Sequence, residues 1–168
     1  KKRFSKWIPD CDAVVDHKYV FENIGYNLKP LDLQGAIGLV QLDKLEEIEV
    51  KRRENKQRIS DSLELISGVK VLGEHPKANT SWFGVPVICE SIELKRKLVS
   101  FLEEKKIQTR NYFAGNILQQ PAYRGLGNHS DYPQATRVLN QVFFVGCSPT
   151  MSEEMLEYVD DVSKSFNS

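Results

Sequence analysis

Apolar residues recur at helical spacing from about residue 31 to residue 66. These positions are Leu33, Ala36, Ile37, Val40, Leu45, Ile48, Ile59, Leu63 and Ile66. Pro30 and Asp32 are typical of a helix start, and Gly68 is placed to end the helix. Between the apolar positions, "EEIEVKRRENKQR" is almost wholly polar and holds pairs of opposite charge four residues apart: Glu47 with Lys51, Glu49 with Arg53 and Glu54 with Arg58. We therefore predict one long helix that is exposed in its middle.

Short apolar, β-branched segments follow this helix and alternate with helical ones. The strand-like segments read "VKVLG", "SWFGVPVIC", "IQTRNYF" and "VFFVG". Pro86 cannot donate to a ladder, so its strand should be an edge strand or contain a bulge. The alternation predicts an α/β or α+β fold, with one long helix and a sheet of three or four strands that carries helices on one face.

Three further helices are expected in the second half of the chain. Ser91 can cap a helix that runs to about Lys105, and Asp131 can open a short helix to about Gln141. The last helix is expected to start at a capping box formed by Thr150 and Glu153. Its inward positions should be Met155, Leu156 and Val159.

Residues 1–30 lack this regularity, so we divide the chain into an irregular segment, 1–30, and a domain, 31–168. The chain begins "KKRFSKW" without a methionine, and we expect it to be a piece of a longer protein. No signal peptide or long apolar run is visible in the sequence.

Composition narrows the class of protein. Of the 168 residues, 23 are Lys or Arg and 23 are Asp or Glu, so the formal charge is zero and no overall attraction to nucleic acid or anionic lipid is expected. The three cysteines lie far apart, which disfavours both a zinc site and a disulfide scaffold. We expect a reduced, cytoplasmic protein.

Metal and nucleophile motifs are weak in this sequence. The segment "DCDAVVDH" gathers Asp10, Cys11, Asp12, Asp16 and His17, but a polar loop explains it better than a metal site does. We expect no metal ligands here. Glycine-rich phosphate loops and the Gly-x-Ser-x-Gly motif are missing from the sequence. The residues alone do not make a complete active site.

Two loops could bind a ligand. In "GYN", Gly25 permits a close backbone approach and Asn27 can meet a phosphate oxygen, although a simple turn cap is an equal alternative. In "TRNYFAGN", Arg110 can bind an anion and the aromatic pair Tyr112 and Phe113 can line a ring, with the amide of Asn116 nearby. An Arg110 that only pairs with a surface carboxylate is the plainer alternative.

Two glycines in "LDLQGAIGLVQL" need compensation, because Gly35 and Gly38 each cost a helix about 1 kcal/mol relative to alanine. Close packing against another backbone, for instance in a second subunit, is the physical reason we favour.

Several of these segments together resemble the DegT-type sugar aminotransferases and dehydrases. "YVFENIGYNLKPLDLQGAIGLVQLDKLEEIEVKRREN" is similar to the family's Gly-Tyr-Asn loop and the long helix after it. "KKIQTRNYFAGNILQQPAY" resembles the nucleotide-sugar 3-dehydrases that act on CDP-4-keto-6-deoxyglucose, where aminotransferase relatives typically have a stretch with Pro and His in place of "AGN". "DHKYVF", "SWFGVPV" and "VLNQVFFVGCSPTMSEEMLEYV" extend the likeness over nearly the whole chain.

The resemblance implies a C-terminal small domain of a fold-type I enzyme that uses pyridoxamine or pyridoxal phosphate. The family's Schiff-base position, a histidine in dehydrases and a lysine in aminotransferases, precedes the match to Lys1, so no catalytic residue is expected in this chain and the piece alone should be inactive. The cysteines of a [2Fe-2S] cluster, if the enzyme has one, also precede it. Cys11 falls after that position and is not assigned as a ligand.

The resemblance also implies site residues and partners. The residue matching Asn27 reaches the cofactor phosphate of the other subunit in a homodimer, and Tyr26, Arg110, Phe113 and Asn116 border the nucleotide sugar. The expected reaction removes the C3 hydroxyl of a 4-keto-6-deoxyhexose in deoxysugar or lipopolysaccharide synthesis, with a reductase partner in the cluster-containing branch. The alternatives are a sugar aminotransferase of the same family and a non-catalytic dimerisation or binding module.

Overall fold

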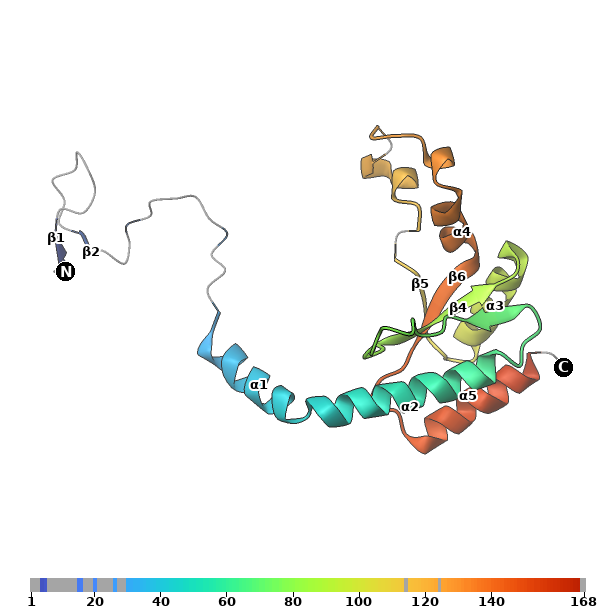
Figure 1. The fold of residues 1–168 in the computed structure, drawn as a ribbon, viewed down its shortest axis with the longest axis horizontal. Coiled ribbons are helices and arrows are strands. Elements are labelled where there is room, and N and C mark those ends of the chain that lie inside the picture. Colours follow the sequence, from blue (N-terminus) through green and yellow to red (C-terminus); the bar gives the residue numbers. More distant parts are fainter. Residues whose placement is uncertain are drawn as a thin grey trace. The chain divides into compact units, whose positions relative to one another are not determined.

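The computed structural model describes residues 4–5, 15–16, 20, 26, 30–113, 115–123 and 125–166. The chain forms two compact units, residues 1–42 and 43–168, which are described separately. In the first unit, β1 (Phe4–Ser5) pairs antiparallel with β2 (Val15–Asp16), and α1 (Asp32–Asp43) follows (Figure 1). The domain boundary predicted at residue 30 stays a prediction.

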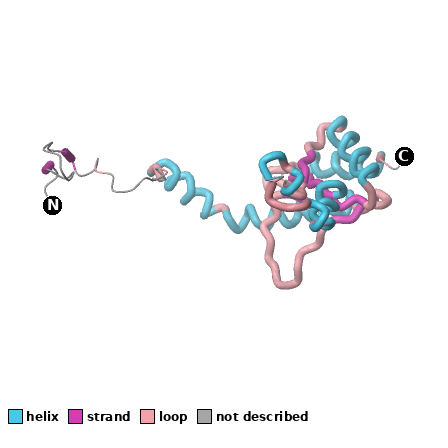
Figure 2. The backbone as a smooth tube through the Cα atoms, turned by 90° about the horizontal axis from the view of Figure 1, so that it is seen from above, coloured by secondary structure: helices cyan, strands magenta, loops and turns pink. Residues whose placement is uncertain are grey.

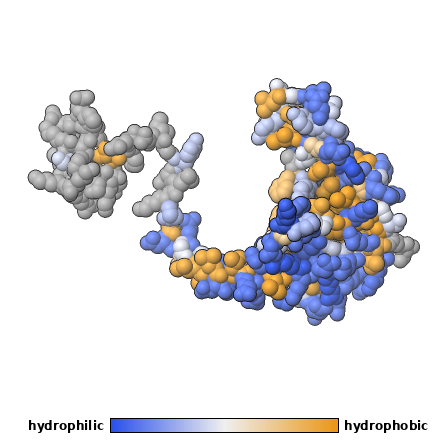
Figure 3. Space-filling model, in the orientation of Figure 1, coloured by the Kyte–Doolittle hydropathy of each residue, from blue (hydrophilic) through white to orange (hydrophobic). Residues whose placement is uncertain are grey.

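Helix α1 begins where the sequence predicts a helix. The backbone N–H of Leu31 donates to Oε1 of Gln34 at 2.8 Å, which satisfies one free donor at the helix start. None of the described residues of α1 is buried, and its large apolar side chains are exposed: Leu33, Ile37, Leu39, Val40 and Leu42. Figure 3 shows these apolar atoms gathered along the helix.

The single long helix predicted from residue 31 to residue 66 is interrupted. Helix α1 ends at Asp43, and α2 (Leu45–Leu63) begins after Lys44, which has φ −97° and ψ −2°. The break is visible as a short non-helical segment in Figure 2. Asp43 is a poor helix former, whereas the apolar periodicity continues through Leu45, so the pattern alone did not reveal the break.

A four-stranded antiparallel sheet forms the centre of the second unit, as the sequence predicts. Its strand order is β3-β4-β6-β5. The strands are β3 (Val69–Val71), β4 (Gly84–Cys89), β5 (Thr109–Asn111) and β6 (Val142–Gly146). Gly68, just before β3, has φ +78°, and a Cβ there would lie 2.6 Å from the side chain of Glu90, so this turn requires glycine.

One face of the sheet is covered by α2, α3 (Ile92–Glu104) and α5 (Glu153–Ser165), and Figure 1 shows α2 and α5 side by side. Alternate residues of the strands and the apolar faces of the helices pack together in one core. From the sheet these are Val85, Val87, Cys89, Phe143, Val145 and Cys147; from the helices they are Ile59, Leu63, Leu98, Leu102, Leu156, Val159 and Val162. The opposite face of the sheet carries the residues between them.

The predicted helix starts are only partly confirmed. The Ser91 side chain accepts from the N–H of Leu94 at 3.0 Å, so it caps α3 as predicted. The last helix is capped by Ser152, which accepts from the N–H of Met155 at 3.3 Å, so Thr150 was the wrong cap. Met155 is exposed rather than inward, whereas Leu156 and Val159 are buried as predicted.

Helix α4 (Pro133–Gln141) is preceded by a short turn of 3₁₀-helix, His129–Asp131. Pro133 occupies its first turn, where the missing N–H costs no intrahelical bond. The helix predicted from Asp131 therefore exists but starts two residues later.

Pro86 lies in β4, an inner strand, so the predicted edge position is wrong. Its carbonyl accepts from the N–H of Leu72 at 3.0 Å, on the side of β3. Because the nitrogen and carbonyl of one strand residue point the same way, the missing donor of Pro86 also faces β3, at the level of Leu72. Strand β3 has already ended at Val71, so no ladder bond with β3 is lost at this level. The ladder with β6 lies on the other side of β4 and does not use this donor.

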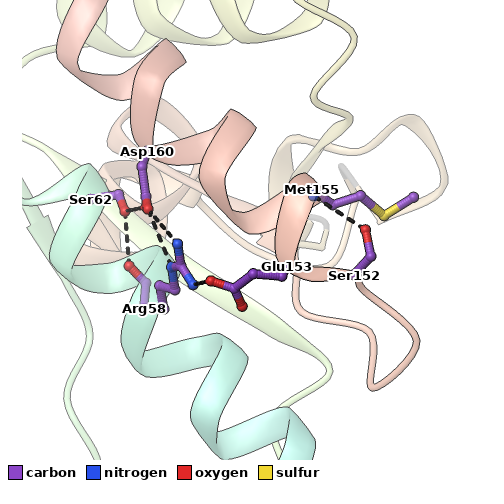
Figure 4. A network of polar contacts seen from close by, with 6 residues as sticks. All are labelled: Arg58, Ser62, Ser152, Glu153, Met155 and Asp160. Atoms are coloured by element: carbon purple, nitrogen blue, oxygen red, sulfur yellow. Dashed lines mark hydrogen bonds and ion pairs between the residues drawn. The ribbon is translucent and has the colours of Figure 1, made fainter.

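A polar network fastens α2 to α5 (Figure 4). Arg58 donates through Nε and Nη2 to Oδ2 of Asp160, at 3.2 and 2.9 Å, and also binds Glu153. The Ser62 hydroxyl donates to the same aspartate. Burial alone would raise the pKa of Asp160, but the bonds from Ser62 and Arg58 outweigh it and hold that pKa below its usual value.

The predicted surface ion pairs of α2 are rearranged by this network. Arg53 does pair with Glu49, at 3.3 Å. Glu54, expected to pair with Arg58, instead binds Lys51 at 3.1 Å. Arg58 turns toward α5 because two carboxylates there offer it more bonds than one exposed glutamate.

None of the helices in the described part of the chain has an apolar stretch of the length that spans a bilayer.

Candidate functional site

The face of the sheet opposite the helices carries the candidate site. Arg110 of β5 stands opposite Phe144 of β6, and Phe144 stands opposite Pro86 of β4. Since directly paired residues point to the same side, these three side chains form a row across three strands. Val85, Phe143 and Val145, their neighbours along the strands, point into the core.

Phe144 of this row is in contact with three more aromatic residues. We call these four residues the aromatic shelf: Phe83, Tyr112, Phe113 and Phe144. The ring centroid of Phe144 lies 5.3 Å from that of Phe83, 6.4 Å from that of Phe113 and 6.5 Å from that of Tyr112. These are normal aromatic contact distances. The rings come from three separate segments of the chain, and the sheet register brings them together.

The backbone of Phe113 is strained. Its φ is +48°, in the left-handed region that bulky residues avoid. The side chain gains little burial in return, because it is 70% exposed. Strain of this kind persists only where the surrounding structure imposes it, and it is concentrated at functional sites.

Gly115 shows how tightly the loop after β5 is held. Its φ is +60°, and a Cβ at this position would lie 2.4 Å from Cβ of Leu139 in α4. Any side chain here would collide with α4. The close approach of loop and helix therefore requires glycine.

Asn116 anchors the same loop from inside. It is 1% exposed, and its Nδ2 donates to the carbonyl of His129 and to Oγ1 of Thr136, both at 2.9 Å. Its Oδ1 accepts from the N–H of Leu118 at 3.2 Å. The amide that the sequence offered as a substrate contact is thus occupied within the chain, and here it holds the loop.

Lys95 connects α3 to the end of β5 and to α4. Its Nζ donates to the carbonyl of Leu139 at 2.7 Å and to Oδ1 of Asn111 at 3.2 Å. The Leu139 carbonyl lies in the last turn of α4, where a cation is favoured by unpaired carbonyls. Burial lowers the pKa of Lys95, since the charged form is partly removed from water.

Arg110 is a cation on the open face. It is exposed, and within the part of the chain that the structure describes its guanidinium forms no hydrogen bond or ion pair. Its charge acts on the carboxylate of Glu103, which accepts from both the N–H and the hydroxyl of Thr109 at 2.6 Å. Those two bonds lower the pKa of Glu103. The plainer reading of Arg110, as half of a surface ion pair, is not what the structure has.

A hollow of about 180 Å³ adjoins the shelf. It is lined by Thr80, Ser81, Trp82, Phe83, Gly84, Pro86, Tyr112 and Phe144. A Cβ at Gly84 would lie 2.5 Å from Cδ2 of Phe144, so the ring rests directly on the glycine backbone. The lining has no lysine, arginine or histidine to bind a cofactor phosphate, and we assign no cofactor to it.

A larger hollow, of about 450 Å³, lies on the helix-covered side, between the turn before β5 and α5. Its lining is mostly apolar and includes Ile107, Met155 and Val159. The predicted ligand residues Arg110 and Phe113 do not line it. We place the site on the open face, where a cation and aromatic rings converge.

The other predicted residues do not belong to the second unit. Tyr26 belongs to the first unit and is 91% exposed. Asn27 lies outside the described residues, as do Asp10, Cys11, Asp12 and His17. Among the residues that are described, no group of three or more His, Cys, Asp or Glu side chains could hold a metal ion.

Sequence reasoning missed Phe83 as part of the site. It is 57% exposed and touches both Phe113, at 6.4 Å between ring centroids, and Phe144. The available signal was the alternation in "VFFVG": with Phe143 in the core, Phe144 must face outward, and a second aromatic segment could then have been sought.

Comparison with known proteins identifies the family. Residues 10–163 match the model of the DegT/DnrJ/EryC1/StrS aminotransferase family. The chain belongs to this family. The curated relatives include the lipopolysaccharide biosynthesis protein RfbH of Salmonella typhimurium, which is 37% identical over 94% of this chain. They also include the dTDP-4-dehydro-2,6-dideoxy-D-glucose 3-dehydratase of Saccharopolyspora spinosa, 33% identical over 95% of this chain.

Solved structures of DegT-family enzymes have the same fold. The Escherichia coli GDP-4-keto-6-deoxy-D-mannose-3-dehydratase with bound hydrated PLP overlays with a TM-score of 0.72 at 27% identity, over 86% of this chain and 38% of its own. An H188N mutant of GDP-4-keto-6-deoxymannose-3-dehydratase, with bound GDP-perosamine, gives a TM-score of 0.73 at 26% identity, over 88% and 39%. The predicted fold class, with its place among fold-type I enzymes, is thereby confirmed.

The chain spans only part of these relatives. It covers 37% of the length of RfbH and 35% of the length of the Saccharopolyspora spinosa enzyme.

Proposed function

We propose that this chain is the C-terminal part of a nucleotide-sugar 3-dehydratase that uses pyridoxamine phosphate. The observation that carries the proposal is the 33% identity, over 95% of the chain, to a relative named as a sugar 3-dehydratase. A second 3-dehydratase supports it through its fold and 27% identity. The reaction removes the C3 hydroxyl of a 4-keto-6-deoxyhexose, for deoxysugar and lipopolysaccharide synthesis.

In this proposal the residues of the second unit bind and orient the nucleotide sugar. Arg110 offers a guanidinium that has no hydrogen-bonding partner among the described residues, and it can bind a diphosphate with two parallel hydrogen bonds. Phe113 holds an exposed ring beside it. Asn116 acts indirectly, because its amide fixes the loop that carries Phe113. Tyr26 is a further proposed substrate contact.

The cofactor belongs to the part of the enzyme before this chain. When bound, its pyridine ring serves as the electron sink for loss of the C3 hydroxyl as water. Asn27 is the proposed contribution of this chain, toward the cofactor phosphate of the other subunit. A [2Fe-2S] cluster with ligands before Lys1, and a reductase that supplies electrons, belong to the same proposal, as does a cytoplasmic location. The chain alone is inactive.

The proposed homodimer is supported by α1. A Cβ built at Gly35 or at Gly38 has no described atom within 4 Å, so neither glycine is explained by packing within the described chain. The exposed apolar side chains around them also lack a partner among the described residues. A second copy that packs on α1 would account for both features.

The runner-up is a sugar aminotransferase, which the family's own description favours. One experiment separates the two. The complete protein, loaded with pyridoxamine phosphate, is incubated with CDP-4-keto-6-deoxyglucose and other 4-keto-6-deoxy sugar nucleotides, with a chemical reductant as electron donor, with and without glutamate, and the products are identified by mass spectrometry. Glutamate-independent loss of oxygen from C3 supports the dehydratase. An amino sugar whose formation requires glutamate would show a transaminase. No reaction of either kind would support the non-catalytic binding module.

A further inference from the structure

Two rings of the aromatic shelf are held out into solvent. Phe83 and Phe113 are 57% and 70% exposed, although burial of each ring would favour folding. They touch each other and Phe144, so they form one continuous apolar surface rather than isolated exposed residues. Contiguous exposed aromatic surface of this kind marks a binding site.

The loop that carries Phe113 is fixed by contacts within the chain. Phe113 keeps a left-handed backbone because the loop after it is fixed by Gly115 against Leu139 and by the buried amide of Asn116. At the other end, Asn111 is held by Lys95. A site whose side chains are already ordered loses less conformational freedom when it binds.

The charge beside the shelf identifies the chemistry of the ligand. Arg110 stands across from Phe144 in the sheet register and has no hydrogen-bonding partner among the described residues. A guanidinium binds phosphate groups, whereas aromatic faces bind flat rings. A ligand that joins a flat ring to a diphosphate satisfies both, and a nucleoside diphosphate is such a ligand.

We propose that the aromatic shelf is the subsite for the base of the nucleotide, with Phe83 as a specific stacking residue and Arg110 on the diphosphate. This inference rests on the proposed function, because it assigns a position to the nucleotide half of that substrate. Phe83 stacks on the base together with Phe113, and Phe144 supports both rings from the sheet.

Stacking alone discriminates weakly between bases, because each base offers a π-face. The shelf therefore binds cytidine and guanosine diphosphates by the same contact. Loss of Phe83 should weaken both nucleotides by similar factors, and base specificity must come from other residues.

The test measures nucleotide affinity in the complete, cofactor-loaded protein. Isothermal titration compares CDP, GDP and inorganic pyrophosphate in wild type and in Phe83→Ala. We expect the Kd of both nucleotides to rise about five- to a hundred-fold, as is typical when a stacked base loses its ring. The Kd of pyrophosphate, which has no base, should stay unchanged. Phe83→Tyr should bind like wild type, whereas Phe83→Leu should behave like Phe83→Ala.

A matched control removes an exposed ring from the other side of the sheet. Tyr158 of α5 is also partly exposed, and Tyr158→Ala should leave all three Kd values unchanged. Melting temperatures of each variant show whether it is folded.

Two results would overturn the inference in different ways. If wild type binds cofactor and nucleotides but Phe83→Ala binds nucleotides equally well, the base lies elsewhere and only the shelf assignment fails. A drop in melting temperature without a change in Kd would then identify the shelf as a contact with another part of the protein. If wild type binds neither cofactor nor nucleotide, the proposed function fails, and the shelf assignment fails with it.

Discussion

Lys95 donates to the carbonyl of Leu139 at 2.7 Å, and this bond ties α3 to the last turn of α4. Lys95→Met keeps the aliphatic stem but leaves the Leu139 carbonyl and the Asn111 side chain without their donor. We expect the free energy of unfolding to fall by about 1–3 kcal/mol, the range for a lost hydrogen bond that involves a charged group. Urea denaturation of wild type and variant measures it. Equal stability would mean that water replaces the ammonium.

The acid sensitivity of the α2–α5 contact follows from Asp160. Its pKa is lower in the folded protein than its usual value of 3.8, so its contribution to stability is present above that value and is lost as pH falls through the folded pKa. Asp160→Asn should therefore cost about 1 kcal/mol at neutral pH, and the difference from wild type should shrink in acid. Thermal melts across the acid range test this. A difference that does not vary with pH would contradict it.

The local structure of the second unit was largely predictable, because its helices and strands carry the full periodicity of the core. The α3 cap at Ser91 and the strand "VFFVG" are examples. Two of the failures share a cause, which is dependence on residues far away in the sequence. Arg58 pairs with Asp160 of α5 instead of Glu54. Pro86 is tolerated inside the sheet only because β3 ends at Val71.

Gly38 in α1 gives opposite expectations for the two possible roles of this helix. If Gly38 contacts a second subunit, Gly38→Ala should weaken the dimer. If it does not, the same change should stabilise α1 by about 1 kcal/mol through helix propensity. Sedimentation equilibrium together with thermal melting separates the outcomes, and we expect the weaker dimer. A more stable protein with an unchanged dimer would remove the packing role.

The strain at Phe113 can be measured with two substitutions that both remove the ring. Phe113→Gly relieves the left-handed backbone, whereas Phe113→Ala keeps most of the strain. We expect the glycine variant to be the more stable of the two by about 1 kcal/mol, while both bind CDP or GDP equally weakly. Chemical denaturation and titration calorimetry give the two quantities. If alanine were the more stable, the backbone would not be strained in solution.

Arg110 should act on substrate binding rather than on folding. In the complete enzyme, Arg110→Ala is expected to raise the KM for the nucleotide sugar about ten- to a hundred-fold, as for a lost hydrogen bond to a charged group. Arg110→Lys should recover only part of this, because lysine offers a point charge without the planar pair of donors. Steady-state kinetics and melting temperatures decide the matter. A lower melting temperature with unchanged KM would show that Arg110 serves the stability of the fold and not substrate binding.

The candidate site was only half visible in the sequence. Arg110 and Phe113 were predicted together because they lie in one short motif. Phe83 and Phe144 were not, since their proximity depends on strand register, which a sequence pattern does not display. Asn116 shows the converse limit: its residue type fits a ligand contact and a loop anchor equally well, and only its burial distinguishes them.

Gly84 has a consequence for how this site can change. Because the Phe144 ring lies where a Cβ at residue 84 would be, even a single methyl group at that position must move the ring or the strand beneath it. The Phe144 ring can therefore lie this close to the β4 backbone only because residue 84 has no side chain. Among natural or designed variants, this position offers a one-residue adjustment of the space above the sheet, without any change to the residues that touch the ligand.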